Sequence, residues 1–334
     1  MEIEPLYDKI GIAFFCDENY IKYASVTIQS LINVSSSSKK YDIVVITSCD
    51  CSNINEYVNG KENISIRMFN INDLINVSKY HFYESAHISK TAYYRLFIPK
   101  IMEKYELVLY MDCDMIAKKN IDEYLNVNRH PNILGVVEDF YFFKMLRKND
   151  KLLPKKYKTT HDYYKQELDI EPEITTRYFN SGLLFFNIQK CIDFNLTEKC
   201  FELMNKNDFL FCHDQDLLNS VCKNNIDWLP QEMNVILPFV SSYGYNIRLP
   251  RKNMLVERDE YQKVYDNAYV LHYCGPKTWV KPSYDYSLAL NWWNVVKDMP
   301  KYKEGIYFSK LSKTIQEKIV NMLSTETINK FLED

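Results

Sequence analysis

The sequence predicts an α/β domain with a mainly parallel sheet, and two observations support this fold class. Short runs of consecutive apolar residues, the pattern of strands buried on both faces, recur along the chain. Between them lie stretches whose apolar residues recur at helical spacing. Strands that alternate with helices in this way are joined by crossover connections, which place neighbouring strands parallel.

The apolar runs mark the expected strands, and helical spacing predicts helices over Tyr20–Ile32 and Ile88–Met102. Pro99 lies inside the second helix. Because proline lacks a backbone N–H and restricts the residue before it, that helix should end or kink near Ile98. The expected strands are Ile10–Cys16, Tyr41–Ser48, Ile64–Phe69, Glu106–Asp112, Asn132–Asp139 and Phe179–Asn187.

One domain is expected over residues 1–298, followed by a helical tail over residues 299–334. The polar, lysine-rich stretch within residues 141–178 lies between two expected strands and is interpreted as an insertion or lid rather than a separate domain. It could grip an acceptor or be a surface excursion. The tail could be an interfacial helix that makes peripheral membrane contact, a helix folded on its own protein, or a dimer contact.

Composition excludes several classes of protein. The net charge of −3 argues against nucleic acid as a partner. No stretch approaches the roughly 18 apolar residues that span a bilayer, and the acidic N-terminus does not resemble a signal peptide. Nine cysteines without a C-x-x-C pair indicate reduced thiols. The expected location is therefore cytoplasmic. Glycine is scarce, and no Gly-rich phosphate loop occurs.

Two acids, Asp112 and Asp114, directly follow the apolar run ELVLYM. Ligand sites in open α/β sheets lie outside the carboxyl ends of strands, and an unpaired buried charge is costly. A hard divalent ion such as Mg²⁺ or Mn²⁺ would satisfy both carboxylates. A D-x-D pair is a weak signal alone, because either acid could merely cap the following turn or helix.

A histidine, His272, lies inside another apolar run, Tyr269–Cys274. A single histidine in such a run is more often a satisfied core residue. Here Gly275 follows, which permits close backbone approach, and Lys277 supplies a compact positive charge suited to phosphate. Imidazole also suits Mn²⁺ beside two carboxylates. These residues together would hold a metal diphosphate.

Two further polar clusters stand beside apolar runs. FNSGLLFFN places Asn180, Ser181 and Gly182 at the entry to a buried strand. HDQDLLN places Asp214 and Asp216 at an expected helix start, where Asp214 could act as the N-cap and Asp216 could favour the helix dipole. Spacing alone does not decide between this capping role and a functional one.

The motifs together resemble glycosyltransferase family 8, the family of glycogenin and the bacterial lipooligosaccharide galactosyltransferases. The resemblance covers about residues 10–295 and is greater to the bacterial branch. It rests on FFCDENY, TAYYRL, MDCDM, FNSG, DQD and HYCG, in that order. It implies a GT-A fold, a requirement for Mn²⁺ or Mg²⁺, and transfer of a hexose from a UDP-sugar with retention of anomeric configuration.

The resemblance also implies roles for individual residues. Asp112, Asp114 and His272 would be the metal ligands, with Cys113 between the two acids. The nucleoside pocket would consist of Phe15, Cys16, Asp17, Asn19 and Tyr20, with Tyr20 against the uracil ring. Arg95 would reach the donor sugar and diphosphate, and Gly275 and Lys277 would contact the diphosphate. The donor hexose would be surrounded by Asp139, Asn180, Gly182, Asp214 and Gln215.

Among these residues, Gln215, Asp214, Arg95 and Asp139 are the expected catalytic group. Gln215 is the residue placed for a nucleophile, yet an amide is a weak nucleophile. A same-face substitution, in which the leaving phosphate takes the proton of the incoming hydroxyl, is therefore preferred. The run after His272 is one residue shorter than the family pattern and lacks its proline before tryptophan, so Lys281 is the alternative to Lys277.

Other functions remain open from the sequence. A nucleotidyltransferase usually has a Gly-rich phosphate loop, which FFCDENY lacks. A non-enzymatic sugar-nucleotide binder would not need a complete metal set. A self-glucosylating role is compatible with 27 tyrosines, although no tail singles out a target. The donor could be UDP-glucose or UDP-galactose, and the acceptor a glycan, glycolipid or glycoprotein.

Overall fold

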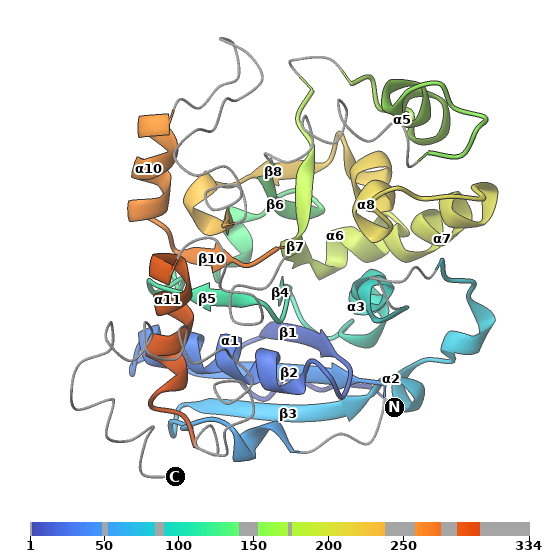
Figure 1. Cartoon of the computed structure of the whole chain (residues 1–334). Helices are drawn as coiled ribbons and strands as arrows, with labels where there is room; N and C mark the ends of the chain where they lie inside the picture. Colours follow the sequence, from blue (N-terminus) through green and yellow to red (C-terminus); the bar gives the residue numbers. More distant parts are fainter. Residues whose placement is uncertain are drawn as a thin grey trace.

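The computed structural model describes residues 2–48, 53–83, 90–139, 153–172, 176–237, 258–274 and 286–300. A seven-stranded sheet forms its centre, with strand order β3-β2-β1-β4-β7-β6-β8 (Figure 1). The strands are β1 (Ile10–Cys16), β2 (Tyr41–Thr47), β3 (Ile64–Asn70), β4 (Leu107–Met111), β6 (Leu134–Glu138), β7 (Phe179–Asn187) and β8 (Ile226–Trp228).

The sheet is mainly parallel, as predicted. β1 pairs parallel with β2 and β4, β2 with β3, and β6 with β8. β7 is the exception in the described sheet, because it runs antiparallel to both of its neighbours, β4 and β6. The amino-terminal end of β7 therefore lies at the same edge as the carboxyl ends of β4 and β6. That edge is where the motifs predict a site.

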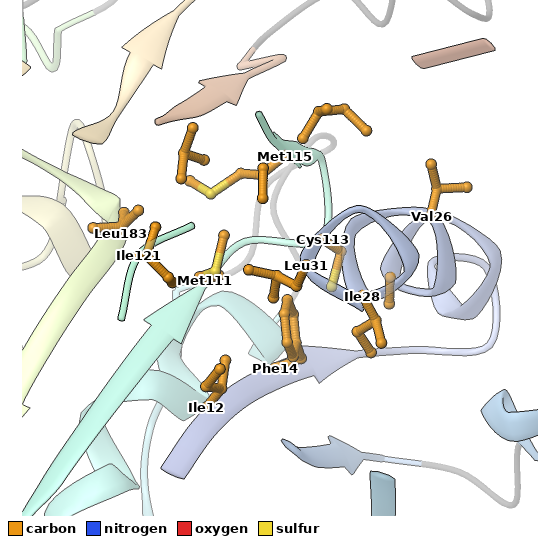
Figure 2. Close-up of a cluster of buried hydrophobic side chains, with 14 of the residues drawn as sticks. Ile12, Phe14, Val26, Ile28, Leu31, Met111, Cys113, Met115, Ile121 and Leu183 are labelled. Carbon is orange, nitrogen blue, oxygen red and sulfur yellow. The ribbon is translucent and has the colours of Figure 1, made fainter. Parts of the chain in front are cut away.

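Successive residues of the central strands face opposite sides of the sheet, and each side carries a hydrophobic core. On β1, Ile12 and Phe14 face one core, and Ala13 and Phe15 face the other. Figure 2 shows the first core, where Phe14 lies near side chains of α1 (Ile21–Val34). Burial on both faces explains why the strands read as continuous apolar runs.

Helices and 3₁₀ turns cover both faces of the sheet. The helices α1 and α11 (Tyr286–Val296) contribute side chains to the first core, as do Ile54 and Met233 from short 3₁₀ turns. The second core is covered by η3 (Lys90–Phe97), α3 (Ile98–Ile101), α5 (Thr160–Leu168), α6 (Ile188–Asp193), α7 (Leu196–Lys206) and α8 (Asp214–Cys222). The remaining described helices and turns are α2 (Ile71–Leu74), α10 (Arg258–Asp266), η1 (Ile54–Glu56), η2 (Val77–Lys79), η4 (Val127–Arg129) and η6 (Gln231–Met233).

The single helix predicted over Ile88–Met102 is wrong. The described part of that stretch is the 3₁₀ segment η3 followed by the short helix α3. The predicted break near Ile98 is confirmed, because η3 ends at Phe97 and α3 begins at Ile98. Pro99 lies in the first turn of α3, where a backbone N–H would have no intrahelical acceptor. The chain therefore changes helix type just before the proline.

A second sheet of three short strands brings two distant motifs together. β5 (Met115–Ala117) pairs antiparallel with β10 (Val270–His272), with His272 opposite Met115. β10 also pairs parallel with β9 (Val235–Ile236). The main chain around Asp114 is thereby fixed beside His272.

The described part of the 141–178 stretch packs into the protein. α5 begins with a capping box between Thr159 and Asp162, and Tyr163 and Tyr164 on this helix are fully buried. Tyr163 and Tyr178 both donate hydrogen bonds to the buried carboxylate of Asp216, at 2.8 and 2.7 Å. This part is therefore not a loose surface excursion.

Two further expectations concern the cysteines and the tail. The cysteines that the structure describes are all free thiols, as predicted: Cys16, Cys113, Cys191, Cys200, Cys212, Cys222 and Cys274. The helical tail lies outside the described residues apart from 299 and 300. In the part of the chain that the structure describes, no helix is long and apolar enough to cross a bilayer.

Candidate active site

The predicted acid pair lies where β4 ends. The backbone N–H of Asp112 donates to the carbonyl of Gly182 on β7, at 2.8 Å. The carbonyl of Asp114 accepts from the N–H of Tyr273, at 2.9 Å. Hydrogen bonds to two sheets thus hold the turn that carries both carboxylates.

Asp112, Asp114 and His272 converge at this edge. One potential ligand atom of each lies within 4.8 Å of the others. The Nε2 atom of His272 is 3.3 Å from Asp114 Oδ1 and 3.7 Å from Asp112 Oδ2. His272 is almost fully buried, and Asp114 is buried with it.

This set of residues fits a divalent ion. Two carboxylates and an imidazole are suitable ligands for Mn²⁺. The space beside them depends on Gly182, because a Cβ atom there would lie 2.4 Å from Cε1 of His272 and 2.8 Å from Oδ2 of Asp112. A position that admits no side chain next to three converging ligands is expected of a metal site.

Arg95 connects the acid pair to helix α8. Its guanidinium lies 3.0 Å from Oδ1 of Asp112 and 3.2 Å from Oδ2 of Asp214, and it donates to the Ser181 carbonyl at 2.5 Å. Its carbon Cζ lies 4.5 Å from the ring centre of Tyr110. Burial alone would lower the pKa of Arg95, but the two carboxylates raise it above the ordinary value, so this arginine stays charged.

The same burial acts in the opposite direction on Asp214. Desolvation raises its pKa to about 6, although the charge of Arg95 and a hydrogen bond with Ser181 partly offset this. Asp214 is buried in the first turn of α8. The fold therefore holds a carboxylate at a position where its charged form is costly.

A network of amides and a carboxylate surrounds Gln215. Its Oε1 accepts from the N–H of Ser181 at 2.9 Å and from Nδ2 of Asn180 at 3.2 Å. Its Nε2 donates to Oδ2 of Asp139 at 3.0 Å, and Asn180 donates to the same oxygen at 3.1 Å. Both ends of the Gln215 amide are therefore fixed, and all four residues are buried.

Asp214 is not the N-cap of α8. The N-cap position belongs to His213, whose backbone has φ 54° and ψ −124° and whose side chain makes no capping hydrogen bond. Asp214 instead faces Arg95, and Asp216 is satisfied by Tyr163, Tyr178 and the N–H of Cys212. The predicted N-cap role of Asp214 is therefore wrong, whereas Asp216 lies in the first turn of α8, where its charge favours the helix dipole.

The residues expected at the nucleoside lie at the end of β1 and directly after it. Phe15 and Cys16 are buried at its end. Asp17 accepts from the N–H groups of Asn19 and Tyr20, at 2.9 and 3.0 Å. Tyr20, just before α1, is 40% exposed, and the centre of its ring lies 5.3 Å from that of Tyr23. The thiol of Cys113, in the adjacent acid turn, donates a hydrogen bond to the carbonyl of Phe15.

Some residues of the predicted site lie outside the described part of the chain, and other residues of the site were not predicted. Gly275, Lys277 and Lys281 lie outside the described residues. Ser181 belongs to the FNSG motif, but no role was predicted for it. Tyr110, which donates to Asp112, had a weak signal as a polar tip at the end of an apolar strand. Asn234, which contacts His272 at 3.0 Å, had none.

Comparison with known protein sequences identifies the relatives of this chain. A family profile described as Glycosyl transferase family 8 matches residues 11–282. General stress protein A of Bacillus subtilis (strain 168) is 26% identical over 230 residues, which are 65% of this chain and 71% of that protein. Lipopolysaccharide 1,2-glucosyltransferase of Escherichia coli (strain K12) is 24% identical over 282 residues, which are 81% of this chain and 73% of that protein.

Solved structures share the fold. The WbbM bifunctional glycosyltransferase matches with a TM-score of 0.74 and 22% identity over 92% of this chain and 53% of WbbM, so this chain spans about half of that protein. An active-site mutant of LgtC matches with a TM-score of 0.65 and 22% identity over 88% of this chain and 99% of LgtC. LgtC, a galactosyltransferase, has also been solved with donor and acceptor sugar analogues (TM-score 0.57, 22% identity, 81% and 90% covered). The predicted GT-A fold is confirmed.

Proposed function

The chain belongs to glycosyl transferase family 8 and is a glycosyltransferase, and on that premise we propose that it moves a hexose from a UDP-sugar to a hydroxyl group with retention of configuration. One observation carries this proposal. The Asp112–Asp114–His272 cluster lies next to a buried arginine and to the Asp139–Gln215 network. A metal-diphosphate site beside a polar sugar site is what such a reaction requires.

The donor would bind along the carboxyl edge of the sheet. Tyr20 would lie against the uracil ring and Asp17 near the base or ribose, with Phe15, Cys16 and Asn19 around them. Asp112, Asp114 and His272 would hold Mn²⁺ or Mg²⁺, which neutralises charge on the diphosphate when bound. Arg95 and Lys277, with Lys281 as the alternative, would contact the diphosphate. The hexose would lie against Asp139, Asn180, Gly182, Asp214 and Gln215.

Charge on the leaving UDP grows as the anomeric bond breaks. Arg95 supports this step because its guanidinium is held in place by Asp112, Asp214 and Ser181 before the reaction begins. A preorganised positive charge needs no reorganisation when the phosphate charge develops. The carboxylate of Asp214 would face the positive charge that develops on the sugar.

Retention is proposed to occur by substitution on one face of the sugar. Oε1 of Gln215 accepts hydrogen bonds from two donors, so its lone pairs are engaged and it is a poor nucleophile. The acceptor hydroxyl would attack the anomeric carbon on the face that UDP leaves. A β-phosphate oxygen of UDP would take the hydroxyl proton, which leaves a glycoside and UDP.

The acceptor is proposed to be a cell-surface glycan or glycolipid, with a glycoprotein as the other class. Support comes from a relative, the lipopolysaccharide 1,2-glucosyltransferase of Escherichia coli. Transfer from a UDP-sugar would take place in the cytoplasm, and there the protein could bind peripherally to the inner face of the membrane.

Release of UDP from a panel of UDP-sugars, with Mn²⁺ or with EDTA, tests the proposal without a known acceptor. Slow hydrolysis of one donor that stops in EDTA is the expected result, and it would identify the sugar. Asp112→Asn and Asp114→Asn should abolish this release while the thermal unfolding curve remains cooperative. If no donor is hydrolysed and UDP does not raise the melting temperature, the UDP-sugar proposal is wrong.

A further inference from the structure

A buried amide joins the two halves of the site. Asn234, which precedes β9, is fully buried. Its Oδ1 lies 3.0 Å from Nδ1 of His272, and its Nδ2 lies 3.0 Å from Oδ1 of Asn180. One side chain therefore touches both a residue of the acid–imidazole cluster and a residue of the Gln215 network.

One backbone N–H group fixes the direction of each hydrogen bond in the series from Asn180 to His272. The N–H of Gly182 can only donate, and it lies 2.9 Å from Oδ1 of Asn180, so that atom is the amide oxygen. An oxygen there requires a donor from Asn234, which must therefore present its NH₂ group to Asn180. The oxygen of Asn234 then faces His272.

The directions of these hydrogen bonds also determine the tautomer of His272. Because Asn234 presents an oxygen, Nδ1 of His272 must carry the hydrogen. In a neutral ring the lone pair then belongs to Nε2, the atom that faces Asp114 and Asp112. An Nε2–H tautomer would instead point a hydrogen at the position where a metal would be bound.

We propose that Asn234 is a positioning residue that holds His272 in the Nδ1–H tautomer and couples it to the sugar-side network. The coupling passes through Asn180, whose Nδ2 donates to Asp139 and Gln215. The tautomer part stands on the geometry of the described residues alone. The coupling to the sugar rests on the proposed function.

The tautomer can be measured in the wild-type protein without metal, donor or substitution. Protein labelled with ¹⁵N-histidine, kept in EDTA, gives separate long-range signals for Nδ1 and Nε2. The chain has six histidines, and the signal lost in His272→Gln identifies the one of interest. A protonated Nδ1 with a pyridine-like Nε2 is expected. An Nδ1 without a proton would overturn the proposal.

Two substitutions separate the two contacts of Asn234. Asn234→Leu removes both, and the affinity for Mn²⁺, followed by the EPR signal of free Mn²⁺, should fall about 10- to 100-fold. Asn234→Asp keeps an acceptor for Nδ1–H but cannot donate to Asn180. Its affinity for Mn²⁺ should therefore remain at least that of wild type, while kcat for UDP release falls about tenfold or more.

Asn187→Asp is the matched control. Asn187 is a buried asparagine at the other end of β7, where it donates to the carbonyl of His130. This variant should keep the wild-type His272 tautomer, Mn²⁺ affinity and kcat. Equal Mn²⁺ affinity in wild type and Asn234→Leu, or unchanged kcat in Asn234→Asp, would refute the corresponding part. Wild type that hydrolyses no donor and is not stabilised by UDP would refute the proposed function, but not the tautomer assignment.

Discussion

The hydroxyl of Thr27, fully buried on α1, donates a hydrogen bond of 2.8 Å to the carbonyl of Cys113, between the two aspartates. The same hydroxyl accepts from the N–H of Met115 at 3.1 Å. Helix α1, on one face of the sheet, therefore fixes the main chain of the turn that carries Asp112 and Asp114. Neither bond involves a side chain of the proposed metal site, so Thr27 acts on the position of the main chain.

Replacing Thr27 with valine should disturb this turn, because the shape is kept while a donor and an acceptor are lost. The N–H of Met115 would be left without its partner, at a cost of about 1–3 kcal/mol in the free energy of unfolding. Affinity for Mn²⁺ should fall as well. Urea unfolding and Mn²⁺ EPR measure the two effects. Thr27→Ser keeps the hydroxyl and should retain most of both; equal losses in the serine variant would show that the methyl group matters instead.

Gly182→Ala should damage the site although the change adds only one methyl group. The new Cβ would lie 2.4 Å from Cε1 of His272 and 2.8 Å from Oδ2 of Asp112, so the ligands must move apart. Overpacking of this kind costs about 1–3 kcal/mol, and Mn²⁺ binding should weaken. Gly60→Ala is the control, because its Cβ would meet no described atom within 4 Å. Equal Mn²⁺ binding by both variants would contradict this account of Gly182.

The raised pKa of Asp214 predicts a specific dependence of stability on pH. Its pKa rises from the ordinary 3.8 to about 6 in the folded protein, so between these values the folded state holds a proton that the unfolded state has lost. As the pH rises from about 4 to 6, Asp214 therefore lowers the free energy of unfolding by on the order of 3 kcal/mol. Its stabilising contribution is fully present only below about pH 4.

Asp214→Asn should remove that dependence, because the amide resembles the protonated acid. In EDTA, the variant should be more stable than wild type at pH 7 and close to it near pH 4, while donor turnover falls. Urea unfolding at several pH values measures the difference. A variant less stable than wild type at pH 7 would mean that the Arg95–Asp214 pair outweighs the cost of burying the carboxylate.

Tyr163→Phe should loosen α5 from α8. The Tyr163 hydroxyl donates to Asp216 and accepts from the N–H of Phe211, at 2.8 and 3.0 Å. Loss of a buried hydrogen bond to a carboxylate should lower the free energy of unfolding by about 1.5–3 kcal/mol. Tyr269→Phe, which removes an exposed bond to Glu123, should cost less than about 1 kcal/mol. Similar costs for the two variants would argue against the buried anchor.

The sequence predicted the central strands well, because burial on both faces leaves a continuous apolar run. Val108 and Phe186, for example, pair across β4 and β7 and are both fully buried. Short strands gave a weaker signal: β8 and β9 contain three and two residues, too few for a period. The stretch around Pro99 failed because apolar spacing does not distinguish a 3₁₀ segment from an α-helix.

The candidate site divides in the same way. Asp112 and His272 were predicted because charged or polar groups at the ends of apolar runs need a partner. Thr27 and Asn234 were not, because a threonine inside a helix and an asparagine before a short strand are common, and their value depends on contacts 86 and 38 residues away. Residues that position other residues leave little trace in a single sequence.

The antiparallel course of β7 has a consequence for how this protein can evolve. The chain leaves the sheet at Asp139 and returns to it at β7. Asn180, the second residue of β7, donates a hydrogen bond of 3.1 Å to Asp139. Both ends of the segment are therefore tied together beside the sugar network. Insertions or deletions that spare the buried α5 anchor can therefore change the length of this connection without shifting the register of β6 or β7.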